Sequence, residues 1–216
     1  MKTPSCIIAY TLINKQWNSA NFAIQLKKLS DMDQAKIKKY LDPKDRQLRI
    51  LTRLLLAECL KTCFNQERIS IKDLTYKNNK PFLNKKIQIS FSHSGNLAVC
   101  ALSTSSIIGI DAEQNVAVEE ILFKEYLSPI EQRIIQDTGN KTTTFLEFWV
   151  KKEALLKAAG LGLTEIDLRS LSVDKEWVQF RNQDFFLRNI CIKSDYIVYL
   201  ATQEKFDIVE IKELNF

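Results

Sequence analysis

The chain has 216 residues, 45% of them hydrophobic and 26% charged, with a formal net charge of +5 at pH 7. A chain of this size buries about 70% of the surface that its unfolded form exposes, so it needs no disulfide or structural metal to fold. No run is long and apolar enough to span a bilayer, and residues 1–4 do not open a signal peptide, so we expect a cytoplasmic protein. The basic excess favours an anionic partner: a nucleic acid, an acidic protein or a phosphorylated small molecule.

Cysteine and histidine usage argues against disulfides and zinc. The five cysteines include no Cys-x-x-Cys pair, and four of them lie in apolar or helical patterns, where a reduced thiol behaves as a small hydrophobe. The only histidine is His93, so a zinc site with several imidazole ligands is not available.

The first half of the chain predicts strands around a helical region. We expect a strand at 6–13, helical structure over 33–64, a strand at 87–91, a turn at 92–96 and a buried strand at 97–102. Pro43 interrupts the helical periodicity, which predicts two helices there instead of one. His93 falls in the predicted turn.

The second half repeats this order of elements. We expect a buried strand at 107–112, helical structure at 118–135 broken at Ser128-Pro129, a helix at 145–159, antiparallel strands at 173–180, 185–193 and 196–202, and one more strand at 207–214. The doubled order predicts an α+β fold of two similar halves, residues 1–103 and 104–216.

Asp111 and Glu113 are candidates for metal ligands. Positions two apart on a strand share a face, and a divalent cation relieves the repulsion between two carboxylates. Most Asp-x-Glu pairs are merely solvent-facing charge. This pair ends an apolar strand beside Gly109, where ligands tend to approach a sheet, and that position favours a site.

A second acidic candidate lies on the long helix. Trp149, Glu153 and Lys157 follow at four-residue intervals, and Lys152 joins the same side. Glu153 and Lys157 alone would suit an ordinary surface pair worth about 0.2–0.5 kcal/mol. That interpretation explains Trp149 poorly, because an indole needs a buried body. If the fold brings Glu153 to the strand pair, the three carboxylates form an all-oxygen pocket suited to Mg²⁺.

His93 has two interpretations. It is either a neutral turn histidine or, with Ser92 and Ser94 beside it, a phosphate ligand. A serine hydrolase is excluded by the absence of a Gly-x-Ser-x-Gly elbow and of a further histidine. No P-loop or dinucleotide fingerprint is present.

In this order, four blocks of the chain resemble the 4′-phosphopantetheinyl transferase superfamily, specifically its large surfactin-activator branch. The blocks are Asn79-Lys80-Pro81, Phe91-Ser92-His93-Ser94-Gly95, Gly109-Ile110-Asp111-Ala112-Glu113, and Trp149-Val150-Lys151-Lys152-Glu153-Ala154 with Lys157 and Gly160. The resemblance covers about residues 36–168. It implies two similar α+β halves with coenzyme A in a cleft between them. It also implies transfer of the 4′-phosphopantetheine arm to a serine of an acyl or peptidyl carrier protein, with release of adenosine 3′,5′-bisphosphate.

The resemblance also implies roles for individual residues. Asp111, Glu113 and Glu153 would hold Mg²⁺, Lys157 would contact the pyrophosphate, and Glu153 would be the general base, directly or through a water. His93 would bind the 3′-phosphate, with Ser92, Lys80 and Arg49 around the nucleotide and Lys36 at another basic position. A basic position of some relatives is Asp33 here, so that contact is not transferred.

An acidic carrier protein is the expected macromolecular partner, and we expect a monomer that binds neither nucleic acid nor membrane. A basic surface would speed the encounter with the carrier, and docking is predicted near residues 161–168. Two alternatives remain open. One is a non-catalytic nucleic-acid-binding module that uses Arg46, Arg49 and Arg53, and the other is a different metal-dependent phosphohydrolase.

Overall fold

The computed structural model describes residues 6–63, 69–77, 80–83, 87–119, 121–206 and 209–216. Asn79, in the first block of the resemblance, lies outside the described residues. The chain separates into two compact units, one formed by residues 1–105 with 208–216 and the other by residues 106–207. No helix within the described ranges is long and apolar enough to cross a membrane.

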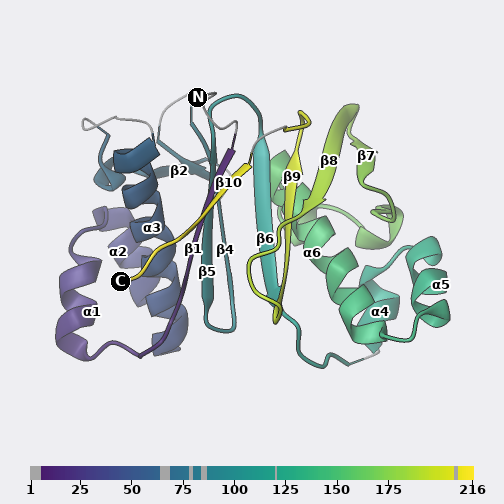
Figure 1. The fold of residues 1–216 in the computed structure, drawn as a ribbon, viewed down its shortest axis with the longest axis horizontal. Coiled ribbons are helices and arrows are strands. Elements are labelled where there is room, and N and C mark those ends of the chain that lie inside the picture. The colour runs from purple at the N-terminus through teal and green to yellow at the C-terminus, as the bar shows by residue number, and fades with distance from the viewer. Residues whose placement is uncertain (1–5, 64–68, 78–79, 84–86, 120, 207–208) are drawn as a thin grey trace. The chain divides into compact units, whose positions relative to one another are not determined.

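The first unit is a mixed sheet with helices packed on it (Figure 1). Its elements are β1 (Cys6–Leu12), α1 (Ser19–Leu26), α2 (Asp31–Lys38), α3 (Pro43–Cys63), a 3₁₀ turn at Ile71–Asp73, β2 (Thr75–Lys77), β3 (Lys80–Phe82), β4 (Gln88–Ser94), β5 (Leu97–Ser103) and β10 (Val209–Glu213). The strand order is β10-β1-β5-β4-β3-β2. Only the β1–β10 pair is parallel, and the other neighbours are antiparallel.

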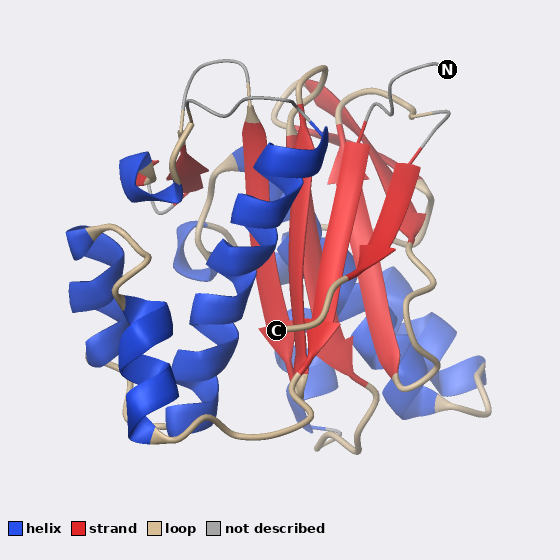
Figure 2. Ribbon diagram, turned by 60° about the vertical axis from the view of Figure 1, so that its left-hand side comes forward, coloured by secondary structure: helices blue, strands red, loops and turns tan. Residues whose placement is uncertain are grey.

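Helix α3 supplies more of the described buried core of this unit than any other element. Five apolar residues with helical spacing are buried in this core, which confirms the predicted helical structure: Leu48, Leu51, Leu55, Cys59 and Leu60. The predicted interruption at Pro43 is also confirmed, since α2 ends at Lys38 and α3 begins at Pro43. Figure 2 shows α1 and α2 beside α3. The sequence analysis did not predict α1.

The second unit is an antiparallel sheet with a long helix on one face (Figure 1). Its elements are β6 (Ile108–Gln114), α4 (Ile121–Tyr126), α5 (Pro129–Asp137), α6 (Lys141–Ala159), 3₁₀ turns at Leu163–Glu165 and Leu168–Ser170, β7 (Trp177–Phe180), β8 (Gln183–Asn189) and β9 (Tyr196–Thr202). The strand order is β6-β9-β8-β7. Ser128 and Glu131 form a capping box at the start of α5, and Gly160 ends α6 with φ of 71°. The α+β class is therefore confirmed.

Two predictions are corrected by the fold. The half predicted as residues 104–216 is wrong at its end, because β10 pairs in parallel with β1 and belongs to the first unit. Strand β10 provides hydrogen-bond partners for the otherwise open edge of β1. The turn predicted at 92–96 is too long: β4 continues to Ser94, so His93 is a strand residue that pairs with Ala98.

Candidate functional site

Gly109 lets the backbone of α6 lie directly against β6. A Cβ at this position would overlap the backbone of Ala154 and Ala158, so no other residue fits without a shift of the helix. The space over Gly109 itself is occupied by α6, so the prediction that a ligand approaches this end of β6 rests on Asp111 and Glu113. The face of β6 that carries Gly109 also carries Asp111 and Glu113, because alternate strand residues share a face. Both carboxylates therefore lie on the α6 side of the sheet.

Lys157 contacts the strand pair directly. Its Nζ donates a hydrogen bond of 2.6 Å to Oδ1 of Asp111, whose side chain is only 6% exposed. One predicted pyrophosphate ligand and one predicted metal ligand thus form an ion pair between α6 and β6. The predicted meeting of the β6 end and the α6 turn is present in the structure.

Glu153 lies one helical turn before Lys157 and has an unusual environment. Burial, with the nearby Asp111 charge second, raises the pKa of its carboxyl to about 7 from 4.5; Lys157 opposes the shift and Glu113 adds to it. Its Oε1 is buried and accepts no hydrogen bond from any residue in the described ranges. A buried acceptor of this kind is costly, and a bound cation or a transferable proton would satisfy it.

The donor chemistry of this cluster fits Mg²⁺, because three carboxylates offer only hard oxygen ligands. No group of three acidic, histidine or cysteine side chains among the described residues is already arranged to hold a metal ion. Lys157 already forms an ion pair with Oδ1 of Asp111. A divalent cation that binds this carboxylate would therefore lie close to the ammonium and be repelled by it.

Lys152 and Trp149 do not share the site as the sequence analysis expected. The Lys152 side chain is fully buried, and its Nζ donates to the carbonyl oxygens of Tyr126 and Leu168 and pairs with Oε2 of Glu131 at 2.7 Å. Trp149 packs edge-on against Tyr126, with ring centroids 5.0 Å apart. Both side chains therefore pack α6 within its unit. Of the residues at four-residue intervals on this helix, Glu153 and Lys157 are the ones that lie near Asp111.

The first unit contains the residues predicted for the nucleotide, and two of them meet at one aspartate. Nε of Arg49 donates to both carboxylate oxygens of Asp45, at 3.1 and 3.0 Å, and Nε2 of His93 lies 3.5 Å from Oδ1 of the same residue. The Arg49 guanidinium lies 3.6 Å from the centroid of the Tyr40 ring. Asp45 was missed from the sequence because an Asp–Arg pair four residues apart looks like surface charge.

A second aspartate organises the neighbouring cations. Asp33 is fully buried and accepts from Nε of Arg53 at 3.3 Å and from the Tyr76 hydroxyl at 2.6 Å. Nζ of Lys36 lies 4.6 Å from the Tyr76 ring centroid, and burial, with the Arg53 charge second, lowers the pKa of Lys36. Asp33 thus serves the internal structure, which agrees with its exclusion as a nucleotide contact. Because Arg53 is buried, it is not available on a surface for nucleic acid.

Lys80 and Ser92 complete the predicted nucleotide group. Burial lowers the pKa of Lys80 to about 8, so part of its population is neutral near that pH. Ser92 is 6% exposed and points to the opposite face of β4 from its neighbour His93, because both are strand residues. In a turn, the Ser92 and His93 side chains could have pointed toward the same ligand. As neighbours on a strand they point to opposite faces of the sheet.

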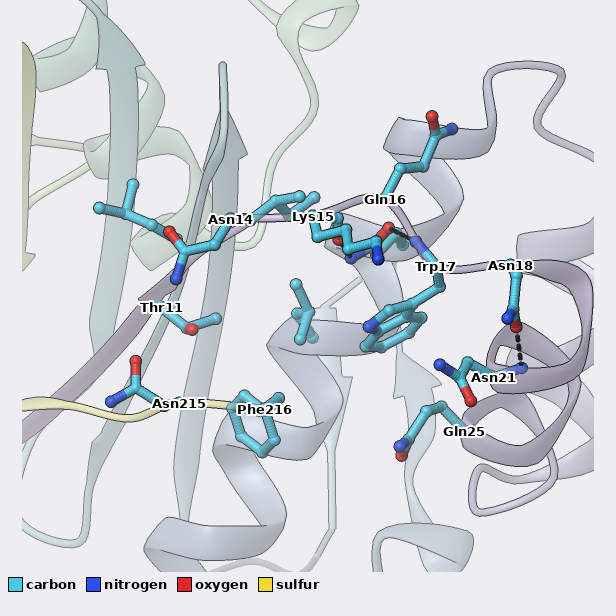
Figure 3. A pocket seen from close by; sticks show the side chains of 14 residues that line it. Thr11, Asn14, Lys15, Gln16, Trp17, Asn18, Asn21, Gln25, Asn215 and Phe216 are labelled. Carbon is cyan, nitrogen blue, oxygen red and sulfur yellow. Dashed lines mark hydrogen bonds between the residues drawn. The ribbon is translucent and has the colours of Figure 1, made fainter.

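A pocket of about 520 Å³ in the first unit lies away from these residues (Figure 3). It is lined by the end of β1, the following loop, α1, α3 and the C-terminal residues, including Trp17, Gln25 and Phe216. Gln47 holds the loop in place, with Oε1 accepting from the Trp17 amide and Nε2 donating to the Lys15 carbonyl. None of the predicted site residues lines this pocket.

Comparison with known proteins gives the family. Residues 107–205 match the model of the 4′-phosphopantetheinyl transferase superfamily, and residues 15–105 match the model of the 4′-phosphopantetheinyl transferase N-terminal region. The chain therefore belongs to the 4′-phosphopantetheinyl transferase superfamily, and the resemblance recognised in the sequence is confirmed.

Individual relatives agree with this assignment. The chain is 28% identical over 143 residues to 4′-phosphopantetheinyl transferase gsp of Aneurinibacillus migulanus, covering 65% of this chain and 60% of that protein. It is 28% identical over 148 residues to 4′-phosphopantetheinyl transferase HetI of Nostoc sp., covering 64% and 62%. The chain thus matches about 60% of the length of these curated relatives. Among solved structures, holo-acyl-carrier-protein synthase of Thermotoga maritima matches 46% of this chain and 64% of that chain, at 19% identity and a TM-score of 0.36.

Proposed function

We propose that this protein transfers the 4′-phosphopantetheine arm of coenzyme A to a serine hydroxyl of an acyl or peptidyl carrier protein. The observation that carries the proposal is the meeting of Asp111, Glu153 and Lys157 on one face of β6 and α6, in a chain of this superfamily. A cluster of two carboxylates and an ammonium suits the transfer of a phosphoryl group, in which charge moves toward the leaving group.

In the proposed reaction the serine oxygen attacks the β-phosphorus of coenzyme A. The bond from that phosphorus to the bridging oxygen breaks, and adenosine 3′,5′-bisphosphate leaves with the electron pair. The serine proton passes to the Glu153 carboxylate, directly or through a water. Lys157, released from Asp111, would hold the pyrophosphate as a point charge.

Asp111, Glu113 and Glu153 would hold Mg²⁺, which when bound neutralises negative charge on the pyrophosphate oxygens. Glu153 then has two proposed roles, as ligand and as base. One of its two carboxylate oxygens is sufficient for each role.

The nucleotide end of coenzyme A would use the first unit. Arg49, His93 and Lys36 gather beside two aromatic rings, and a guanidinium stacked on Tyr40 presents its remaining N–H groups to an anion. We propose that this cationic cluster binds the 3′-phosphate, with Lys80 and Ser92 also at the nucleotide. The predicted coenzyme A cleft between the halves remains a prediction.

The acidic carrier is the proposed partner of a cytoplasmic monomer. Leu163, in the segment predicted for docking, is 41% exposed, as a contact residue for a partner requires. The net charge of +5 would steer an acidic carrier toward the enzyme at low salt.

A single transfer assay tests the proposal. The protein is incubated with a fluorescent coenzyme A conjugate, Mg²⁺ and an apo carrier protein, and the label is located by mass spectrometry. Label on the carrier serine supports the transferase, whereas hydrolysis of the conjugate without labelling supports a phosphohydrolase. A carrier whose serine is replaced by alanine is the matched control and should remain unlabelled.

A further inference from the structure

We infer that Asp45 is a positioning residue for the nucleotide phosphate, acting through Arg49 and His93. The inference rests on the proposed function, and it adds a residue that neither the sequence pattern nor the family assignment points to. Asp45 does not bind the anion, since its own charge repels phosphate. It contacts an arginine on α3 and a histidine on β4, so it links two side chains from different elements.

The geometry explains how one carboxylate can serve both partners. Nε of Arg49 is shared between Oδ1 and Oδ2 of Asp45, which fixes the edge of the guanidinium that points back along the helix. Among the residues that the structure describes, only Nε of this guanidinium donates a hydrogen bond, so both Nη groups keep their donors for a ligand. The Tyr40 ring at 3.6 Å covers one face of the guanidinium plane, which restricts its rotation.

The same carboxylate reaches across to the sheet. His93 is 48 positions along the chain, yet its Nε2 lies 3.5 Å from Oδ1 of Asp45, and the two side chains are similarly half-buried at 24% and 25% exposure. A carboxylate that lies beside one ring nitrogen of an imidazole fixes the orientation of the ring. Asp45 therefore orients the Arg49 and His93 side chains before any ligand binds. Their orientation in the free protein reduces the conformational entropy that is lost on binding.

Two opposite effects are expected when Asp45 is neutralised, and their balance decides the inference. Removal of a negative charge should strengthen phosphate binding, whereas loss of the fixed Arg49 and His93 orientations should weaken it. If positioning dominates, Asp45→Asn should weaken coenzyme A binding about 10-fold by calorimetry and dephospho-coenzyme A binding less than about 2-fold. At saturating coenzyme A, the rate of transfer should return to near the wild-type rate, so KM rises while kcat changes little.

Because His93 is the only histidine, its imidazole signals in a ¹H–¹⁵N NMR spectrum are assigned without ambiguity. Asp45→Asn should shift these signals in the free protein, before any substrate is added. The matched control is Asp42→Asn, an exposed aspartate that caps the same helix by accepting from the Lys44 amide at 2.9 Å. Asparagine caps equally well, so this variant should leave both the signals and the affinities unchanged.

The outcomes separate this inference from the proposed function. Wild-type protein that neither binds coenzyme A nor labels a carrier would overturn both. Normal wild-type transfer with unchanged or tighter coenzyme A binding in Asp45→Asn would overturn the positioning role alone. As a second test, Asp45→Asn should add little to His93→Ala combined with Arg49→Lys, and full additivity would contradict action through these two residues. Thermal unfolding verifies that each variant is folded. Loss of a partly exposed ion pair should change the unfolding temperature little.

Discussion

Nζ of Lys157 lies 2.6 Å from Oδ1 of Asp111, so an ammonium from α6 holds a carboxylate that the metal is proposed to use. The pair joins a helix and a strand edge within one unit, and the Asp111 side chain is almost fully buried. Metal binding at this carboxylate must therefore compete with an internal cation.

We first predict that Lys157→Met strengthens divalent-cation binding while impairing transfer. Loss of a unit charge beside a largely buried carboxylate should be worth about 1 kcal/mol or more, which corresponds to a 5- to 10-fold gain in Mg²⁺ or Mn²⁺ affinity by calorimetry. Removal of the pyrophosphate contact should reduce kcat by about 100-fold. Lys151→Met is the matched control, because Lys151 lies over the Tyr199 ring and not at the carboxylates. Weaker metal binding in Lys157→Met would contradict the competition.

The pKa of Glu153 gives the second prediction, which concerns the metal-free protein. A carboxyl with a folded pKa of about 7 and an ordinary value of 4.5 keeps its proton longer in the folded state. Between these pH values the folded protein binds more protons than the unfolded chain, so the free energy of unfolding falls as pH rises through this window. The full cost, at most about 3 kcal/mol, is reached above pH 7, and none of it is present below about pH 4.

Urea unfolding in EDTA at pH 5.5 and pH 8 measures this effect. Glu153→Gln should remove most of the loss of stability that the wild type shows between the two values. Added Mg²⁺ should restore wild-type stability at pH 8, because the cation binds the ionised carboxylate. An identical pH dependence in the wild type and the variant would show that Glu153 does not titrate in this window.

The residues that meet at the site were predicted better than the side chains that support them. The meeting of Asp111 with the Lys157 turn follows from strand alternation and helical spacing, together with the recognised motif order. The burial of Lys152 could not be predicted, because α6 carries apolar residues on most of its surface, so its periodicity does not distinguish a reactive side from a packed one. The Lys152 partners Tyr126 and Glu131 lie on α4 and α5, so no pattern within α6 indicates these contacts.

In the first unit, too, contacts between residues on different elements could not be predicted from local sequence patterns. The contact between Asp45 and His93 depends on how α3 crosses the sheet, which no local pattern specifies. The return of β10 to β1 was missed because a short exposed strand has the same alternation whichever sheet it joins. The helical region that contains α3 was predicted because burial of one helix face leaves a local periodicity in the sequence.

The third prediction concerns Gly109. Gly109→Ala forces a methyl group against the backbone of Ala154 and Ala158, and the helix must move away from β6. Overpacking of this kind should lower the free energy of unfolding by about 3 kcal/mol, and transfer should fall because Glu153 and Lys157 move with the helix. Chemical denaturation and a transfer assay on the folded fraction measure the two effects. Gly139→Ala is the control, since no atom lies within 4 Å of its Cβ position.

The fourth prediction separates the internal role of Lys152 from catalysis. Lys152→Met removes the ammonium from a buried pair, leaving Glu131 charged while two backbone carbonyls lose their donor. Removal of one partner of such a pair should cost about 3–5 kcal/mol in the free energy of unfolding. Glu131→Gln added to Lys152→Met removes the uncompensated charge, so the double variant should be more stable than Lys152→Met alone.

Coenzyme A binding to the folded fraction of this double variant, measured by calorimetry, should stay within about 2-fold of wild type, because the buried Lys152 ammonium contacts Glu131 of α5 and two backbone carbonyls. If Lys152 were a ligand of the pyrophosphate, as its place beside Glu153 in the motif suggests, affinity would instead fall about 10-fold even in the stabilised protein. Coenzyme A affinity in the double variant therefore decides whether Lys152 has an internal structural role or binds the pyrophosphate. Equal instability in the single and double variants would contradict a paired charge, and would place the stabilising contribution in the two carbonyl contacts alone.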